Sequence, residues 1–201
     1  MIAGFEHHSG YLGRAAQVAV LNDVRAVLER TPLYQPTMPK TGKPLSVSMS
    51  NCGSLGWLTD KDGGYRYQAT HPATGDRWSP IPASIMDVWR AVLGNAPEPE
   101  ACLINWYGPG AKLGLHKDAD EDDQVTPVVS ISLGDDAWFR IGGLTRKSAT
   151  DRVLLRSGDV AVLGGEARRA YHGIDRIIRG SSDLLDEPGR FNLTLRRVTP
   201  V

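Results

Sequence analysis

The second half of the chain consists of short apolar segments separated by turn residues, and this pattern constrains the fold more than any other feature. Eight β-like segments follow one another from residue 101 onward: ACLINWY, AKLGLHK, PVVSISL, AWFRIGG, RVLLRSG, DVAVLGG, RAYHGI and FNLTLRRV. Turns that contain Gly or Asp lie between them, which is typical of all-β sandwiches and barrels. The sequence therefore predicts a mainly β protein whose core is a two-sheet jelly roll or a barrel.

Two helical segments precede this β core. Residues 14–30 and 82–93 each carry apolar side chains at helical spacing, and a proline or a glycine follows each of them. Between the helices, the glycines at positions 63 and 64 predict a hairpin turn. We expect residues 1–98 to form N-terminal helices and a lobe, and residues 99–201 to form the β core, within one integrated domain.

Composition limits the classes of protein to which the chain can belong. Lys and Arg together number 23, as do Asp and Glu, so the net charge is zero, which argues against a passive, basic nucleic-acid coat but leaves the partner open. No apolar run approaches the roughly 18 residues of a membrane span, and the segment MIAGFEHHSG lacks the basic start and apolar stretch of a secretory signal, so we expect none. Cys52 and Cys102 form no zinc or disulfide pattern, so we expect two buried, reduced thiols in a cytoplasmic protein.

A His-x-Asp motif at His116 and Asp118 is the first candidate for chemistry. Positions two apart on a strand share a side, so both side chains can bind one ion. A surface His beside a solvated Asp is the alternative, and a third ligand is needed. His172 lies in the next-to-last β segment, which a jelly roll can place beside His116, and two His with one carboxylate form the facial triad of Fe(II) sites. We expect the remaining histidines at the solvated surface, two of them near a mobile terminus: His7, His8 and His71.

The last β segment carries polar residues on one face and apolar residues on the other. The polar face consists of Arg190, Asn192, Thr194 and Arg196. A solvated edge strand would explain such a face. The alternative is a binding surface for a dicarboxylate, because guanidinium groups pair with carboxylates through two hydrogen bonds.

Longer motifs resemble the AlkB family. They are NWYGPGAKLGLHKDADE at 105–121, VSISLG at 129–134, GGLTR at 142–146, SGDV at 157–160, GGE at 164–166, YHG at 171–173 and RxNxTxR at 190–196. The segment MSNCGSLGW at 49–57 is similar to the bacterial members specifically. The resemblance covers about residues 45–198 and implies that the β core is a double-stranded β-helix, a jelly roll.

The resemblance implies an Fe(II)- and 2-oxoglutarate-dependent dioxygenase that uses O₂ to demethylate damaged bases. The implied substrates are 1-methyladenine and 3-methylcytosine in single-stranded or flipped-base DNA, with RNA as a second substrate. Decarboxylation of 2-oxoglutarate gives succinate, and the methyl group leaves as formaldehyde. Residues 1–98 then include a nucleotide-recognition lobe. We expect a monomer with no obligate protein partner and no membrane association.

The resemblance also assigns roles to single residues. The implied iron ligands and catalytic residues are His116, Asp118 and His172. Arg190 matches the residue that pairs with the far carboxylate of 2-oxoglutarate, and further co-substrate contacts match Asn105, Tyr107, Asn192 and Arg196. The implied substrate contacts are Trp57 and Tyr65 at the base, Asp120 at its exocyclic amine, and Arg146 at the entrance of the strand.

Charged residues near these motifs are candidates for contacts to the nucleic-acid backbone, with ordinary surface charge as the alternative: Lys112, Lys117, Arg146, Lys147, Arg168 and Arg169. For Asp122 and Asp123 we expect a solvated loop.

The sequence also departs from bacterial members of the family at three places. Trp106 and Leu163 stand where relatives often carry Arg and Trp, and residues 168–170 differ locally. Base preference and strand affinity are therefore left open. Two other functions stay open as well: a 2-oxoglutarate oxygenase that acts on a protein or a small molecule, and a non-enzymatic protein that binds metal or alkylated bases without turnover.

Overall fold

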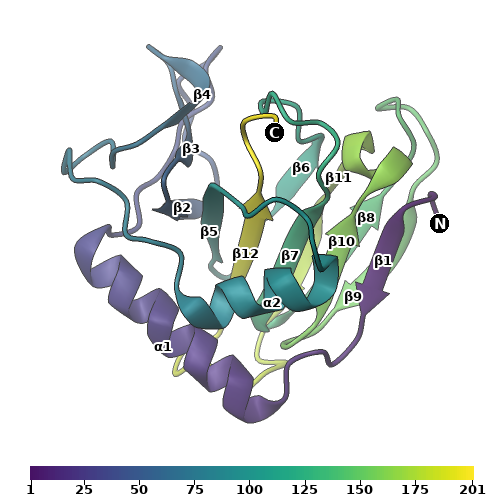
Figure 1. Ribbon diagram of the computed structural model, residues 1–201. Helices are drawn as coiled ribbons and strands as arrows, with labels where there is room; N and C mark the ends of the chain where they lie inside the picture. The colour runs from purple at the N-terminus through teal and green to yellow at the C-terminus, as the bar shows by residue number, and fades with distance from the viewer.

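Two antiparallel sheets form the framework of the protein in this computed structural model, which describes residues 1–201. The larger sheet contains, in spatial order, β1 (Phe5–His8), β10 (Val160–Leu163), β7 (Val128–Gly134), β12 (Arg190–Arg196), β5 (Ala101–Tyr107) and β2 (Ser48–Gly53). The smaller sheet contains β6 (Leu113–His116), β11 (His172–Ile178), β8 (Asp136–Ile141) and β9 (Asp151–Leu155). The two sheets confirm the predicted jelly roll (Figure 1).

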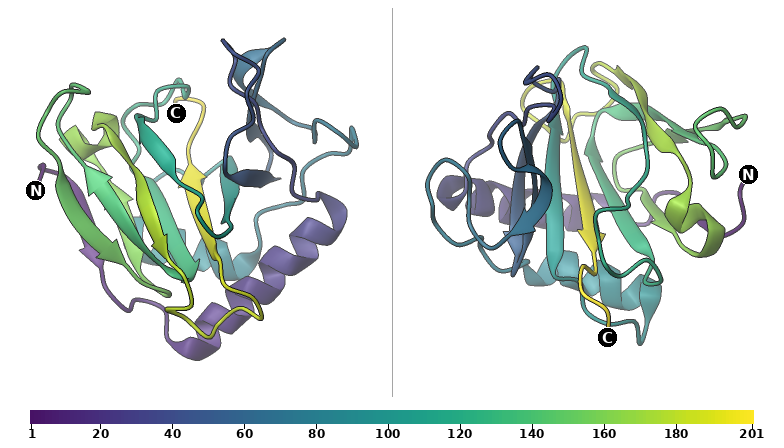
Figure 2. Two further views of the ribbon diagram at one scale, coloured as in Figure 1. Left: turned by 180° about the vertical axis from the view of Figure 1, so that it is seen from behind. Right: turned by 90° about the horizontal axis from the view of Figure 1, so that it is seen from above.

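A separate two-stranded hairpin stands apart from both sheets. It consists of β3 (Gly56–Asp60) and β4 (Gly64–Gln68), which turn at the predicted glycines. Figure 2 shows this hairpin at one end of the molecule and helix α1 (Arg14–Arg30) at the other. The hairpin is therefore free to contact a ligand that enters between the sheets.

The helices α1 and α2 (Ala83–Leu93) pack on the outer face of the larger sheet, as their apolar spacing requires. Val24, Trp89 and Ile85 are fully buried there against the apolar side of β12. Burial of each such side chain contributes about 1.5–3 kcal/mol. Neither helix has the length and apolar character needed to cross a membrane.

A second apolar cluster fills the space between the two sheets. Its members include Tyr107 from the larger sheet and Phe139 and Ile174 from the smaller one. Strand β12 separates the two clusters, because it lies at the centre of the larger sheet between β7 and β5. Its polar face is therefore buried between the sheets, and the explanation as a solvated edge strand is wrong.

The N-terminal residues are part of the sheet, so the prediction of a mobile terminus is wrong. Strand β1 pairs with β10, and His7 Nε2 lies 2.8 Å from a carboxylate oxygen of the buried Asp159. The surface prediction also fails for His71, which is 2% exposed and whose Nε2 lies 2.9 Å from the carbonyl oxygen of Pro32. Each imidazole therefore pairs with an oxygen atom of the folded protein.

Cys52 and Cys102 lie directly opposite one another on β2 and β5 as free, fully buried thiols, which confirms the prediction.

Candidate active site

The two histidines of the expected triad lie opposite one another on neighbouring strands. His172 begins β11 and faces His116 at the end of β6, and Asp118 follows two residues later. The His116 and His172 Nε2 atoms lie 3.9 and 3.8 Å from the Asp118 carboxylate oxygens. The ligand atoms of all three residues lie within 4.8 Å of one another. This spacing and donor set fit one Fe(II) ion held by a facial triad.

Backbone carbonyls orient both imidazoles for metal binding. His116 Nδ1 lies 2.9 Å from the carbonyl oxygen of Gly114, and His172 Nδ1 lies 3.0 Å from that of Ala170. A carbonyl oxygen only accepts, so Nδ1 carries the hydrogen and the Nε2 lone pair is left for a metal.

The electrostatics of the triad favour an anionic Asp118 carboxylate and a neutral His172 imidazole. Burial by itself would raise the pKa of Asp118, but Arg196, His172 and His116 outweigh it and hold that pKa well below its usual range. Burial, together with His116, lowers the pKa of His172 to about 4. Both groups are therefore in the protonation state that a metal ligand needs at neutral pH.

Gly173 allows the two histidine strands to approach closely. A Cβ at this position would lie 2.5 Å from the carbonyl oxygen of Leu113 on β6. Only the absence of a side chain lets β6 lie next to β11 and bring His116 opposite His172.

The polar face of β12 lies behind the triad and lines the same cavity of about 450 Å³. Asn192 donates to Ser130 Oγ at 2.7 Å and accepts from Thr194 Oγ1 at 2.9 Å. Asn105, opposite Asn192 on β5, has a buried Oδ1 without a partner, and Arg196 has a buried Nε without one. These unpartnered polar atoms fit a small, polar co-substrate between the sheets.

Arg190 lies at the far end of the same face and is fully buried. It donates to Ser132 Oγ at 2.6 Å and to the carbonyl oxygen of Asp135 at 3.2 Å, while its Nε has no partner. Burial lowers its pKa to about 10, so it remains charged at neutral pH. Arg190 does not line the cavity itself but lies directly opposite Tyr107, which does. The predicted contact between Arg190 and a diacid stays a prediction, because Tyr107 and not Arg190 forms the cavity wall here.

The mouth of the cavity carries aromatic residues from the hairpin. Trp57 and Tyr65 stack with ring centroids 5.8 Å apart, and both line the cavity that holds the triad. The Trp57 indole N–H donates to an Asp120 carboxylate oxygen at 2.8 Å. Arg146 lies 6.0 Å from the ring centroid of Tyr171 on the opposite rim. All four expected substrate residues thus line this one cavity: Trp57, Tyr65, Asp120 and Arg146.

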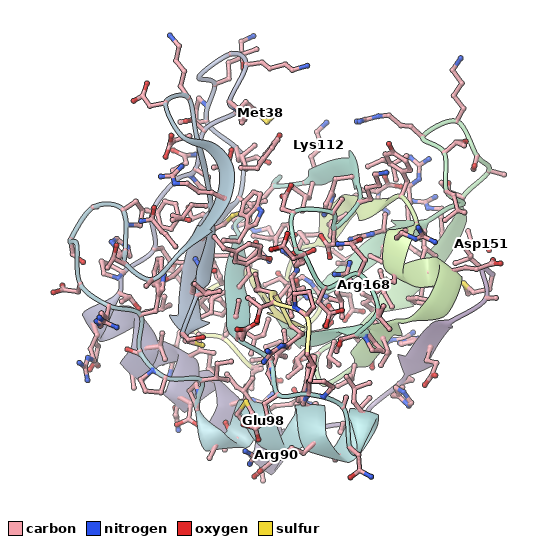
Figure 3. All side chains as sticks on the ribbon, turned by 45° about the horizontal axis from the view of Figure 1, so that its top comes forward. Met38, Arg90, Glu98, Lys112, Asp151 and Arg168 are labelled. Carbon is pink, nitrogen blue, oxygen red and sulfur yellow. The ribbon has the colours of Figure 1, made fainter.

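The acidic loop after Asp118 is less solvated than its composition suggests. Asp122 is exposed as predicted, but Asp123 is buried and accepts from the backbone N–H and the hydroxyl of Thr126. Arg168 is 1% exposed and pairs with the buried Glu121, so it is not a backbone contact for nucleic acid. Arg168 is part of the 3-10 helix η1 (Gly165–Arg169), and Figure 3 shows it on the opposite side of the view from Met38. The predictions for Asp123 and Arg168 are therefore wrong, because sequence composition does not reveal buried ion pairs.

The departures from the bacterial pattern lie in different environments. Leu163 lines the cavity wall, whereas Trp106 packs on Phe191 with ring centroids 4.6 Å apart and does not line the cavity. Of these two residues, only Leu163 can therefore change the shape of the cavity.

The sequence matches the 2OG-Fe(II) oxygenase superfamily over residues 4–196. It is 49% identical over 199 residues to an alpha-ketoglutarate-dependent dioxygenase AlkB homolog of Caulobacter vibrioides, with 98% of this chain and 89% of the relative covered. The chain belongs to the AlkB family of this superfamily. The AlkB protein of Escherichia coli K12 is 43% identical over 182 residues, with 89% and 83% of the two chains covered.

The solved structure of OsALKBH1, another AlkB-type protein, superposes with a TM-score of 0.80 at 30% identity and covers 98% of this chain and 99% of its own. More distant relatives are called a DNA N(6)-methyladenine demethylase in Arabidopsis thaliana, 30% identical over 93% of this chain and 47% of its own, and a tRNA demethylase in Schizosaccharomyces pombe, 37% identical over 41% and 28%.

Two residues in contact with the AlkB-type site were not among the predicted ones. Tyr67 and Glu121 contact Arg196 behind the triad. Strand alternation already placed Tyr67 on the same side of the hairpin as Tyr65, which was the available signal. Glu121 carried no such signal, because its acidic neighbours suggest a solvated loop.

Proposed function

We propose that this AlkB-family chain oxidatively removes alkyl groups from bases in nucleic acid. The observation that carries the proposal is the hairpin mouth: stacked Trp57 and Tyr65, with the Asp120 carboxylate beside them, open into the cavity that contains the triad. An aromatic face and a carboxylate suit a cationic base such as 1-methyladenine or 3-methylcytosine. An oxygenase for peptides or small molecules needs the triad and the diacid face but not this mouth.

His116, Asp118 and His172 would hold Fe(II), and Arg190, Asn105, Tyr107, Asn192 and Arg196 would hold 2-oxoglutarate. Iron and 2-oxoglutarate together supply O₂-dependent oxidation of a methyl group, with succinate and CO₂ as the other products. The chain's own residues then have three tasks. The triad holds the metal, the β12 face orients the diacid, and the mouth positions the methylated base over the metal.

A base can reach the triad only when it leaves its stack. The cavity mouth accepts one base between the hairpin and the opposite rim, so the substrate is single-stranded or has its base flipped. We propose DNA as the main substrate, with RNA as the second one. The hairpin within residues 1–98 would recognise the nucleotide, and residues 99–201 would carry the chemistry. We further propose that the protein acts as a monomer in the cytoplasm.

Formaldehyde release from single-stranded oligonucleotides with one 1-methyladenine or 3-methylcytosine tests the proposal. Each formaldehyde should be accompanied by at least one succinate, because 2-oxoglutarate also decomposes without substrate, and an unmethylated oligonucleotide should give no formaldehyde. An Asp118→Ala variant should give neither product while it keeps the wild-type circular dichroism spectrum. Full activity in that variant would refute the ligand assignment. If only a peptide or a small molecule stimulates succinate formation, the protein is still an oxygenase, but its proposed function as a nucleic-acid dealkylase is refuted.

A further inference from the structure

Tyr67 connects the recognition hairpin to the interior of the protein. It lies on β4, directly opposite Trp57 on β3. Its hydroxyl donates to Glu121 Oε1 and accepts from Arg196 Nη1 at 3.1 Å. No other hairpin residue forms a hydrogen bond or an ion pair with either of these two charged groups. The hairpin therefore reaches the β12 face through one hydroxyl group.

Glu121 is buried and is shared by two guanidinium groups. Its Oε1 lies 3.3 Å from Arg196 Nη1, and its Oε2 lies 3.1 Å from Arg168 Nη2. A buried carboxylate is stable only when charged or hydrogen-bonding partners replace water. Both oxygens of Glu121 have such partners, so its position is strongly fixed.

Arg168 anchors Glu121 on the side away from the hairpin. It donates to the carbonyl oxygens of Asp118 at 2.9 Å, Asp123 at 3.1 Å and Thr126 at 3.1 Å. These bonds hold the loop that begins at the metal-ligand carboxylate. Glu121 is thus a fixed point, and Tyr67 and Arg196 are placed relative to it.

Arg196 receives its orientation from this group of residues. Its Nη2 donates to Asp118 Oδ1 at 2.7 Å, and its Nη1 contacts Tyr67 and Glu121. Its Nε has no partner, although the side chain lines the cavity. Arg196 can therefore offer Nε to a bound carboxylate only while its Nη atoms stay in place.

We infer that Tyr67 and Glu121 are positioning residues that fix Arg196 for 2-oxoglutarate and couple the recognition hairpin to the co-substrate site. The inference rests on the proposed function in one respect, the role of Arg196 as a co-substrate contact. A nucleotide that binds at Trp57 and moves the hairpin shifts the Tyr67 hydroxyl and, with it, Arg196. Linkage then requires that the nucleotide and 2-oxoglutarate change each other's affinity by the same factor.

The test is the dissociation constant of 2-oxoglutarate for Mn(II)-loaded protein, measured by calorimetry without oxygen. Tyr67→Phe should weaken binding roughly three- to tenfold, as expected for the loss of an ordinary hydrogen bond. Glu121→Gln, which keeps the shape and removes the charge, should weaken it at least as much. Thr59→Val is the matched control, because it removes a hairpin hydrogen bond to the Thr37 carbonyl that does not reach Glu121. The control should bind within twofold of wild type.

Turnover separates positioning from general destabilisation. In Tyr67→Phe the KM for 2-oxoglutarate should rise while kcat at saturating co-substrate stays within about twofold of wild type. A merely unstable protein would instead lose kcat and leave the dissociation constant unchanged. Addition of a methylated oligonucleotide should change 2-oxoglutarate affinity in wild type and in Thr59→Val but not in Tyr67→Phe.

An Arg196→Lys arm distinguishes the two ways in which the inference can fail. If Arg196→Lys binds 2-oxoglutarate as wild type does, the proposed co-substrate site itself is wrong. If Arg196→Lys binds weakly but folded Tyr67→Phe and Glu121→Gln bind normally, the positioning role is overturned and the proposed function stands.

Discussion

Trp57 combines two contacts at the cavity mouth, the stacking surface of its ring and the hydrogen bond from its indole N–H to Asp120. Trp57→Ala removes both and should cost about 1–3 kcal/mol of binding to a methylated oligonucleotide. Trp57→Phe keeps a ring and should fall between Ala and wild type. Fluorescence anisotropy would measure both affinities. Decomposition of 2-oxoglutarate without substrate should continue in both variants, and wild-type affinity in Trp57→Ala would exclude stacking.

Arg190 is the buried charge at the inner end of the site. Arg190→Met keeps most of the volume but removes the charge that we propose pairs with one carboxylate of 2-oxoglutarate, and a hydrogen bond to a charged group is worth about 1.5–3 kcal/mol. The dissociation constant of 2-oxoglutarate for Mn(II)-loaded protein should therefore rise by roughly one to two decades. Arg197→Met provides the control, since Arg197 contacts Thr199 and Glu98 outside the site. An unchanged dissociation constant in Arg190→Met would show that the diacid binds at another place in the protein.

At the scale of elements, the contact between β6 and β11 determines whether the triad can form. Gly173→Ala would place a Cβ 2.5 Å from the Leu113 carbonyl oxygen and force the strands apart. Metal affinity should fall roughly ten- to a hundredfold, as for loss of support around a ligand. Gly114→Ala on β6 is the matched control, because a Cβ there meets nothing within 4 Å. Titration with Co(II), followed by visible absorption, measures the metal affinity of both variants. Equal affinities would show that β6 and β11 tolerate the methyl group of Gly173→Ala.

Strand β1 is held to the sheet by Asp159, whose side chain accepts from the backbone N–H groups of Gly10 and Arg156 and contacts His7. Burial opposes ionisation, but these donors keep the Asp159 pKa below its ordinary value. A lowered carboxylate pKa contributes stability above the unfolded-state pKa of about 3.9, and this contribution is lost as pH falls through the folded pKa.

Asp159→Asn should therefore reduce the free energy of unfolding at pH 7 by about 1–3 kcal/mol. It should also make stability less dependent on pH below about pH 4. Urea unfolding at pH 7 and at pH 3 measures both effects. Asp183→Asn serves as control, because that carboxylate is 93% exposed in its pair with Arg14 and such pairs contribute about 0–1 kcal/mol. An unchanged pH profile in Asp159→Asn would mean that other carboxylates dominate acid unfolding.

For the whole molecule, a net charge of zero coexists with cations gathered at the cavity mouth. Lys117 and Arg146 line the mouth, and their charged groups lie over the Tyr171 ring, at 5.8 and 6.0 Å from its centroid. Lys112, Lys147 and Arg169 are also exposed. Binding of a methylated single strand should therefore weaken with salt, with a logarithmic slope that decreases by about 0.7 for each phosphate contact removed.

Lys117→Gln and Arg146→Gln should each reduce that slope, whereas Arg90→Gln on α2 should not, because Arg90 pairs with Glu98 on the far side of the molecule (Figure 3). Anisotropy titrations between 50 and 200 mM salt would provide the slopes, a range over which such contacts are well resolved. A slope near zero in the wild-type protein would rule out backbone contacts by these cations.

The sequence by itself determined the elements and the ligand set. Helical spacing predicted α1 and α2, alternation on β12 separated its polar from its apolar face, and His116, Asp118 and His172 were found from residue type and strand position. These features depend on residues that are close together in the chain or on the periodic pattern of apolar residues. The sequence alone is therefore sufficient to predict them.

Only the tertiary structure decided which charges are buried and which are free. Arg168 and Arg169 are neighbours, yet the first is 1% exposed within an ion-pair group and the second is exposed. Glu121, Tyr67 and Arg196 come from three distant segments, and β1 joins the sheet through β10. Such contacts depend on which surfaces meet when the chain closes, and desolvation, which decides their energy, is a property of that closed packing and not of the residue type.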